Sequence, residues 1–342
     1  MKKTTSFIWI LALLSAFVFG CAKAAPEQGN TQADSGEARL SVVTTIFPEY
    51  DWVRNIMGDQ AKQADVSMLL DSGVDLHSFQ PTADDIIRIS DCDIFVYVGG
   101  ESDDWVEDAL KEAKNPEMIV VNLLEALGDA AKEEEIVEGM EADHDENHAD
   151  EDHEEGEDHD HEGPEYDEHV WLSLKNAVKL VDVLKDALSE ADPAHAEAYA
   201  KNAAAYTEKL NALDEAYAEA VSAAPRKTVL FGDRFPFRYL TDDYGLTYYA
   251  AFVGCSAETE ASFETIAFLS EKVDELGLHT VLSLEGSNRR IAETVISSSS
   301  GDDVRILSMD SMQSTTRQDV ASGTTFLSVM EKNLEVLKEA LR

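Results

Sequence analysis

Short apolar runs alternate with longer amphipathic stretches along most of the chain. The short runs are rich in β-branched and aromatic residues and end at Pro, Gly or polar residues, which is typical of strands buried in a parallel sheet. They cover residues 40–47, 66–70, 94–98, 118–122, 228–231, 246–252, 280–284 and 304–307. The alternation predicts an α/β protein with parallel sheets.

Amphipathic helices are predicted between these strands, because apolar residues there recur at intervals of three and four. The predicted helices cover residues 49–57, 173–188, 193–224, 262–276, 289–298 and 327–341, and one more begins at Pro81. The longest, over residues 193–224, would extend about 48 Å at roughly 1.5 Å per residue. A helix of that length can brace two halves of a molecule as a rigid strut.

The two groups of strands lie on either side of the long helix. We therefore predict an α/β fold of two lobes, each a small, mostly parallel sheet flanked by helices, joined by a long rigid helix. The predicted boundaries are 39–190 for the N-terminal lobe, 191–225 for the bracing helix and 226–342 for the C-terminal lobe. Sheets of this kind bind ligands outside the carboxyl ends of their strands, so the loops after Leu70, Phe231, Leu284 and Leu307 should hold the site.

Acidic residues greatly outnumber basic ones. The 342 residues are 44% apolar, enough for ordinary cores, but 69 Asp and Glu face 27 Lys and Arg, for a formal net charge of -42. Such a charge repels phosphate backbones and excludes nucleic acid as a partner. Residues 133–168 hold 20 of the acidic residues and no Lys or Arg, so we predict a disordered loop there. Five histidines interleaved with its carboxylates suit weak accessory metal binding: His144, His148, His153, His159 and His161.

The N-terminus has the pattern of a targeting segment. Two lysines precede an apolar run, residues 7–19, that is too short to span a hydrocarbon core of about 30 Å. We predict a signal peptide over residues 1–20 and, from a lipobox-like Gly-Cys pair, lipidation at Cys21. Residues 21–38 would form a flexible tether. The mature chain is then expected at the outer face of the cell membrane, held by its lipid anchor.

Histidines and cysteines supply few other candidates for chemistry. His77 lies in the polar loop after the second strand, and His169 directly follows the acidic loop and precedes a helix. Two imidazoles together with strand-end carboxylates and a His-rich tract form a set that Zn²⁺ favours. Cys92 and Cys255 are about half a chain apart, and we expect them to be buried free thiols.

Several motifs resemble those of the zinc and manganese solute-binding lipoproteins of ABC importers, the family that includes zinc-uptake binding proteins and metal-binding adhesins. They are residues 43–48, 75–82 and 168–173, the His-rich acidic insert and the long helix. The resemblance implies two α/β lobes with little hinge motion, a metal ion in the cleft between them and delivery of that ion to a membrane permease. It also implies that His77 and His169 are metal ligands.

The second lobe departs from the pattern of that family. Arg234 stands where relatives carry a ligating His or Glu, and an Arg side chain cannot bind a metal cation. The resemblance places the remaining acidic ligand at or beside Asp310. Glu285, at a strand end, is a candidate either to bind the metal or to pair with Arg234, and Asp233 neighbours the displaced ligand. We expect this lobe to supply carboxylates, ranked Asp310, Glu285 and Asp233.

Together these observations predict a monomeric protein, not an enzyme, that captures a divalent metal ion and delivers it to an ABC importer permease. The His-rich tract favours zinc, whereas the loss of an imidazole in the second lobe moves the site toward oxygen ligands and manganese. Two other interpretations stay open. One is a metal-buffering surface adhesin that binds through its His-rich loop, and the other is a zinc hydrolase, for which the sequence offers no known catalytic motif.

Overall fold

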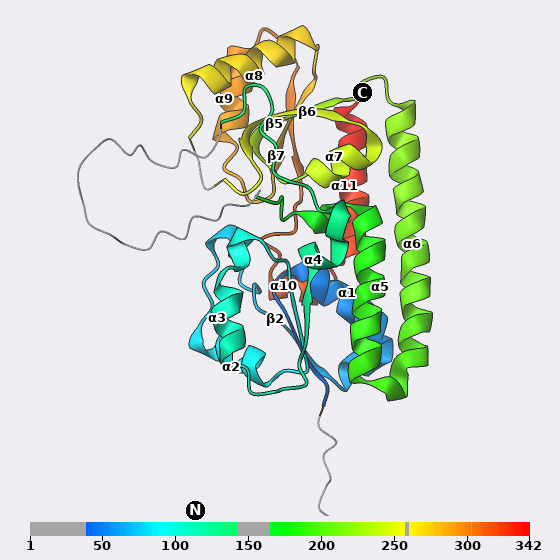
Figure 1. The fold of residues 1–342 in the computed structure, drawn as a ribbon. Helices are drawn as coiled ribbons and strands as arrows, with labels where there is room; N and C mark the ends of the chain where they lie inside the picture. The colour runs from blue at the N-terminus through cyan, green and yellow to red at the C-terminus, as the bar shows by residue number, and fades with distance from the viewer. Residues whose placement is uncertain (1–38, 142–164, 257–259, 302) are drawn as a thin grey trace, which may run out of the picture. The chain divides into compact units, whose positions relative to one another are not determined.

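Two four-stranded parallel sheets form the framework of the protein (Figure 1). The first has the order β2-β1-β3-β4 and the second has the order β6-β5-β7-β8, so the two share one topology. The strands are β1 (Ser41–Thr44), β2 (Asp65–Met68), β3 (Ile94–Tyr97), β4 (Ile119–Asn122), β5 (Thr228–Phe235), β6 (Thr247–Val253), β7 (Thr280–Leu284) and β8 (Arg305–Met309). The predicted fold class is confirmed.

This computed structural model describes residues 39–141, 165–256, 260–301 and 303–342. The signal segment, Cys21, the tether and the five histidines of the acidic loop therefore lie outside the described residues. Residues 39–342 form one unit. None of the helices in the described part of the chain has both the length and the apolar character needed to cross a membrane.

Helices connect the strands, and several begin at side chains that cap them. Ser173 accepts a hydrogen bond from the Asn176 N–H at the start of α5, and Ser262 accepts one from Thr265 at the start of α8. The helices are α1 (Phe47–Met57), α2 (Ala83–Asp91), α3 (Trp105–Lys111), α4 (Leu123–Leu127), α5 (Leu174–Ala191), α6 (Ala196–Ala223), α7 (Arg238–Tyr244), α8 (Phe263–Glu275), α9 (Arg290–Ser298), α10 (Arg317–Ala321) and α11 (Phe326–Ala340).

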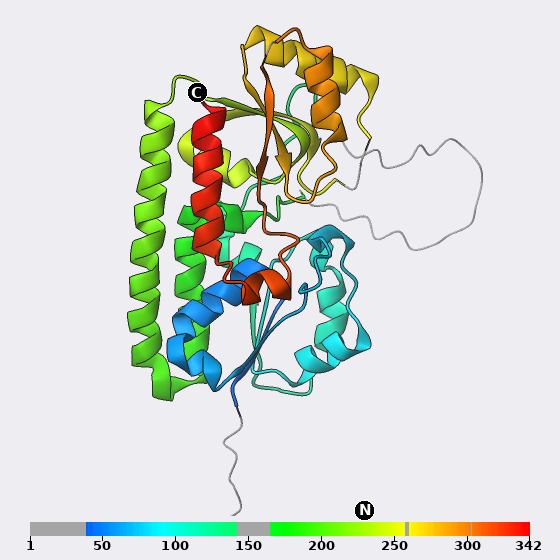
Figure 2. The same ribbon diagram turned by 180° about the vertical axis from the view of Figure 1, so that it is seen from behind.

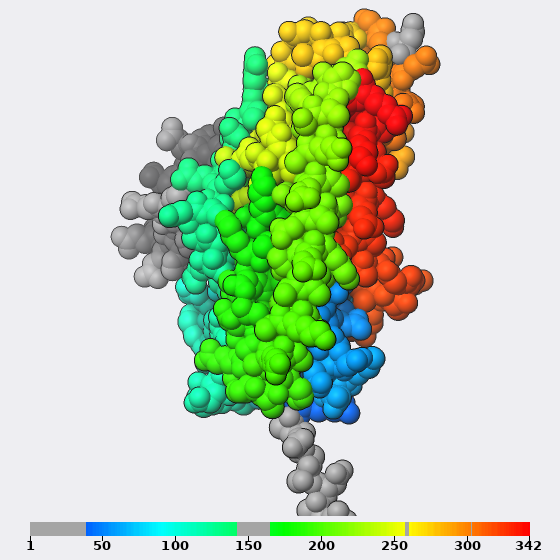
Figure 3. Space-filling model, turned by 90° about the vertical axis from the view of Figure 1, so that its right-hand side faces the viewer, coloured from blue at the N-terminus to red at the C-terminus, as the bar shows by residue number. Residues whose placement is uncertain are grey.

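Helix α6 is the predicted brace. It has 28 residues and follows a short 3₁₀ turn, Pro193–His195, so the α-helix itself begins three residues later than predicted. Its buried residues recur every three or four positions, and it packs on α5, α1 and α11 (Figure 3). The Tyr206 hydroxyl donates to Asp51 of α1 at 3.2 Å, and the Tyr217 hydroxyl donates to the Met330 carbonyl of α11 at 2.6 Å. The helix thus contacts elements of both predicted lobes.

The main hydrophobic core runs through both halves of residues 39–342. Helix α11 ends the chain, yet its first residue, Phe326, places its ring edge-on to Trp52 of α1 with centroids 5.1 Å apart. Figure 2 shows α10 and the start of α11 beside α1. A smaller second core lies where α8 and α9 cover the second sheet.

Both ends of the acidic segment are ordered, which corrects the expectation of a disordered loop over all of residues 133–168. Glu133 pairs with Tyr166 in an antiparallel bridge, and the Glu134 N–H donates to the Glu165 carbonyl at 2.8 Å. Further along, Glu141 forms a bridge with Phe252 of β6. Amino-acid composition does not predict these contacts, because backbone pairing depends on the neighbouring segment of the polypeptide rather than on side-chain hydropathy.

Candidate metal centre

Two imidazoles from distant parts of the sequence meet in the structure. His77 lies in a 3₁₀ turn, Leu76–Ser78, whose preceding residue Asp75 accepts a hydrogen bond from the His77 N–H at 3.1 Å. His169 directly precedes the turn Val170–Leu172 and is completely buried. The two Nε2 atoms are 3.3 Å apart, so the structure brings together the two histidines that the sequence predicts.

The opposite nitrogen of each ring is held by a hydrogen-bond acceptor. The Nδ1 atom of His77 lies 2.7 Å from the Ser102 hydroxyl and 3.4 Å from Oε2 of Glu168. The Nδ1 atom of His169 lies 2.9 Å from Oδ1 of Asp167. With both Nδ1 atoms donating, each Nε2 presents a lone pair to the same point. Two nitrogens about 2.05 Å from a tetrahedral Zn²⁺ would lie roughly 3.3 Å apart, so the spacing suits that ion.

An amide from the second half of the chain reaches both imidazoles. The Gln313 Nε2 lies 2.9 Å from Nε2 of His77 and 2.7 Å from Nε2 of His169. Because both ring atoms are acceptors, the amide donates one hydrogen to each. Gln313 is buried, and its Oε1 lies 3.2 Å from the Ser311 hydroxyl oxygen. The amide therefore marks the position toward which both lone pairs point.

A thiol completes the cluster. His77, His169 and Cys255 each offer one ligand atom, and these atoms all lie within 4.8 Å of one another. Cys255 follows β6 directly after Gly254, where a Cβ atom would lie 2.8 Å from Cε1 of His169. Only a glycine lets the backbone pass this close to the buried ring. Cys255 is a free thiol, as predicted, but it is only partly buried and belongs to the cluster.

Burial sets the protonation states of this cluster. It lowers the pKa of His77 to about 3, helped by the neighbouring His169, so the ring stays neutral and keeps its lone pair near pH 7. It raises the pKa of the Glu168 carboxyl to about 7. It also raises the pKa of the Cys255 thiol well above the usual range, and nearby Glu168 and Glu134 add to the rise. A bound cation would reverse this effect on the thiol.

The three carboxylates predicted from the second half bind backbone or hydroxyl groups. Asp310 accepts a bond from the Met312 N–H at 2.9 Å, and Glu285 accepts bonds from the N–H and hydroxyl of Ser311 at 2.8 and 2.6 Å. Asp233 accepts a bond from the Leu284 N–H at 3.1 Å. Among the described residues, none of the three joins the group formed by His77, His169 and Cys255. Instead, Asp310 and Glu285 shape the loop that carries Gln313.

Arg234 pairs across the two halves of the chain. Its Nη2 atom lies 2.7 Å from Oδ2 of Asp75, two residues before His77, and its Nη1 atom donates to the Ser256 carbonyl at 3.3 Å. The expected alternative of a Glu285–Arg234 pair is therefore replaced by an Asp75–Arg234 pair. Sequence analysis could not find this partner because Asp75 lies in the other sheet's loops, 159 positions away.

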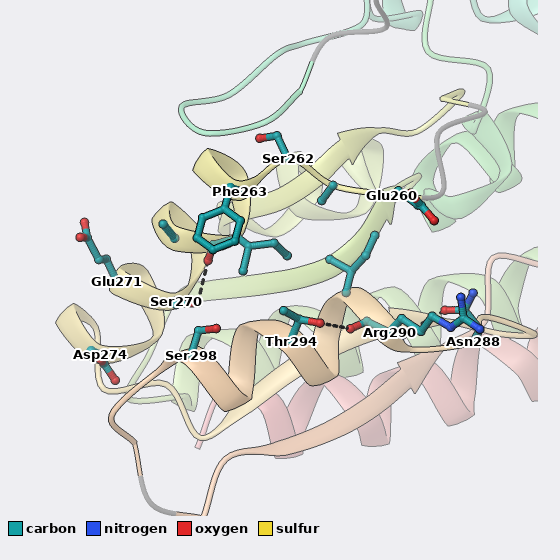
Figure 4. A pocket seen from close by; sticks show the side chains of 14 residues that line it. Glu260, Ser262, Phe263, Ser270, Glu271, Asp274, Asn288, Arg290, Thr294 and Ser298 are labelled. Carbon is teal, nitrogen blue, oxygen red and sulfur yellow. Dashed lines mark hydrogen bonds between the residues drawn. The ribbon is translucent and has the colours of Figure 1, made fainter.

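A separate cavity of about 570 Å³ lies between α8 and α9 (Figure 4). Its lining includes Phe263, whose side chain is 90% exposed, and the polar side chains of Glu260, Asn288 and Thr294. None of the residues that line it belongs to the imidazole cluster. The cavity therefore plays no part in the metal centre.

Two residues of the centre, Cys255 and Gln313, escape the sequence prediction. The predicted site loops did not include the one after β6, which begins with Gly254-Cys255-Ser256. Gln313 stands three residues after Asp310 and belongs to none of the motifs that the sequence analysis considers. Knowledge of the strand order would have pointed to the loop after β6, because all parallel strands of one sheet end at the same edge.

The fold and the cluster of His77, His169 and Cys255 are those of a two-sheet α/β protein with a candidate metal site. The chain belongs to the family described as zinc-uptake complex component A, periplasmic, whose model matches residues 42–340. Membership confirms the family that the sequence motifs indicate.

Known relatives agree with this assignment. The zinc-binding lipoprotein AdcA of Streptococcus pneumoniae is 34% identical over 339 residues, which cover 99% of this chain and 61% of AdcA. The chain thus spans about three fifths of the length of that relative. The high-affinity zinc uptake system protein ZnuA of Bacillus subtilis is 30% identical over 341 residues and covers 100% of this chain and 99% of its own. The crystal structure of the Zn(II)-bound ZnuA-like domain of pneumococcal AdcA matches with a TM-score of 0.67 and 31% identity, over 89% of this chain and 99% of that domain.

Proposed function

We propose that this protein captures Zn²⁺ outside the cytoplasm and delivers it to the permease of an ABC importer. The observation that carries the proposal is the convergence of the His77 and His169 lone pairs, 3.3 Å apart, with Nδ1 of each ring held by an acceptor. Such prior orientation reduces the reorganisation needed to bind a cation. The relatives named for zinc binding and zinc uptake support the choice of ion.

The cluster also suits transport better than catalysis. Protein groups occupy several directions around the point between the imidazoles, whereas a hydrolytic zinc needs an open position for water. The side chain of His77 keeps 9% exposure, and that of His169 keeps none. An ion would therefore enter and leave past His77.

The remaining partners follow from the sequence. Lipidation at Cys21 would hold the protein at the membrane surface, within reach of a permease. The histidines of the acidic loop, at 144, 148, 153, 159 and 161, would supply weak accessory sites that load the buried centre.

A zinc titration of histidine variants tests the proposal. Because each imidazole supplies one ligand, His77→Ala and His169→Ala should each weaken the tight zinc site by more than about 100-fold, beyond the cost of losing an outer-shell partner. His195→Ala is the matched control, since that ring is partly exposed and pairs with Asp192 at 2.7 Å. Isothermal titration with a competing chelator gives the affinities. Unchanged tight binding in both site variants would overturn the proposal.

Delivery needs a second measurement in cells. A strain that lacks this gene should take up less radioactive zinc from zinc-poor medium, and the parent gene should restore the uptake. His77→Ala should fail to restore it although His195→Ala succeeds. Equal uptake with and without the gene would show that the protein binds zinc without supplying an importer.

A further inference from the structure

We propose that the Cys255 thiolate binds the captured metal directly and makes this site select zinc against manganese. This proposal rests on the zinc-capture function above. It adds that the Cys255 sulfur of the second half completes the site and that the resulting ligand set favours zinc. Its first support is position, because the sulfur lies within 4.8 Å of a ligand atom of each imidazole. In a tetrahedral N₂S zinc site the nitrogen–sulfur distances are roughly 3.6 Å, so a shift on the order of 1 Å would close the cluster.

A second support is that other side chains of this half are already engaged. Arg234, at the position where related proteins carry a ligand, is tied to Asp75 at 2.7 Å. Asp310, Glu285 and Asp233 each accept hydrogen bonds from backbone N–H groups nearby. Of the His, Cys, Asp and Glu side chains described in this half, Cys255 is the one grouped with the two imidazoles, and the Gln313 amide contacts both rings.

Charge gives a third argument. Two neutral imidazoles and an amide place no negative charge in contact with a divalent cation, since the carboxyl groups of Asp167 and Glu168 lie behind the rings. A buried cation is stabilised by a negative charge at close range. A thiolate supplies one negative charge at the metal itself. The thiol proton leaves on binding, so the step exchanges one proton for one metal ion at sulfur. The Gln313 amide would supply its oxygen in the fourth direction after the amide turns, because the nitrogen that faces the imidazoles is a hydrogen-bond donor.

The ligand set then determines selectivity. Thiolate and imidazole ligands suit Zn²⁺, whereas Mn²⁺ prefers carboxylate, carbonyl and water oxygens. A carboxylate at the same place would leave the two ions closer in affinity. The Cys255 thiolate therefore favours zinc over manganese. The sequence leaves that choice open, because the loss of a histidine in the second half favours manganese.

The test compares Cys255→Ser with the parent and with Cys92→Ala, a matched control because Cys92 is a buried free thiol in the first half that donates to the Ile89 carbonyl. Competition titrations should show zinc affinity lowered more than about 100-fold in Cys255→Ser, more than outer-shell losses cost. Manganese affinity should change less than about tenfold, because Mn²⁺ gains little from sulfur. The Cys92→Ala protein should bind both ions as the parent does.

A spectroscopic readout separates ligation from mere packing. One equivalent of Co²⁺ should give the parent and Cys92→Ala a thiolate-to-cobalt charge-transfer band in the near ultraviolet, and Cys255→Ser should lack it. A parent that binds zinc tightly without this band, or a Cys255→Ser variant with parental zinc affinity, would overturn the thiolate assignment and leave zinc capture intact. A parent without any tight zinc site would instead remove the proposed function.

Discussion

Asp167 holds His169 through two hydrogen bonds at once. Its Oδ1 atom accepts from the backbone N–H and lies 2.9 Å from Nδ1 of the same residue. This fixes the tautomer that leaves the Nε2 lone pair free for a metal. We expect Asp167→Asn to weaken zinc binding about 10-fold and Asp167→Ala about 100-fold, the usual range for such partners.

Competition titration measures this effect, and circular dichroism shows whether the variants remain folded. The control is Asp192→Asn, which alters an Asp–His pair at His195 on the surface. Equal zinc affinity in Asp167→Ala and the parent would contradict the orienting role.

Site residues that stand in a short sequence motif were predictable. Site residues that only the packing of distant segments brings together were not. His77 and His169 each stand in a recognisable local motif, and the structure joins them. Cys255 and Gln313 have no such motif. They reach the site because Gly254 permits a close approach and because Glu285 orders the loop at Ser311. Contacts of this kind depend on how strands from different parts of the chain lie together.

Asp51 links three helices and gives a prediction at the scale of elements. Its Oδ2 atom accepts from the Tyr206 hydroxyl of α6 and the Phe326 N–H of α11, both at 3.2 Å. Burial raises the pKa of this α1 carboxyl from 3.8 to about 6. Between these values the folded protein binds more protons than the unfolded chain, so stability falls as pH rises from about 4 to 6. Above pH 6 the cost is present in full, about 3 kcal/mol.

Asp51→Asn should remove this cost, because an amide oxygen still accepts both bonds and carries no charge. The metal-free variant should be more stable than the parent by about 1 to 3 kcal/mol at pH 7, and this difference should shrink near pH 4. Urea unfolding at both pH values measures it. Asp59→Asn is the control, since Asp59 is exposed beside Lys62. A constant difference across the pH range would contradict the assignment.

Elements were more predictable than contacts. The strand predicted at residues 280–284 matches β7, and the helix predicted at 289–298 matches α9 within one residue. The bounds of such elements are predictable because hydrophobic periodicity and helix-capping residues lie within the element's own sequence. Strand β5 runs to Phe235, four residues past its prediction, because it continues through an irregularity in its pairing with β6 between Phe231 and Arg234. That irregularity is a property of the pair, so one strand's sequence does not show it.

The acidic loop leads to a prediction for the whole molecule. If the buried centre is the capture site, deleting residues 143–162 should remove weakly bound ions and leave one tight zinc ion per chain. An imidazole that packing does not hold in place loses conformational entropy on chelation, so we expect each site in this segment to bind more weakly than the centre. Calorimetry of the deletion variant and the parent gives both stoichiometries. Loss of the tight phase on deletion would favour the metal-buffering interpretation.

Membrane attachment through Cys21 is a further prediction for the whole molecule. Cys21→Ser removes the only thiol of the Gly-Cys pair and should release the protein into the medium or leave an unprocessed precursor. A myristoyl-type single chain binds membranes only marginally, so stable retention would require the full lipid modification. Cell fractionation followed by immunoblotting measures the distribution. Unchanged processing and retention of this variant would contradict the anchor.

The contact between Phe326 and Trp52 means that the last helix of the chain finishes the interior of its first half. Although the two sheets share one strand order, neither half of the chain can be replaced by that of a relative without changing this core contact. A hybrid gene joined near residue 225 would pair one parent's α1 with another parent's α11. Recombination between relatives should succeed only where both partners of this contact descend from the same parent. The gene segments that encode α1 and α11 must therefore be inherited together.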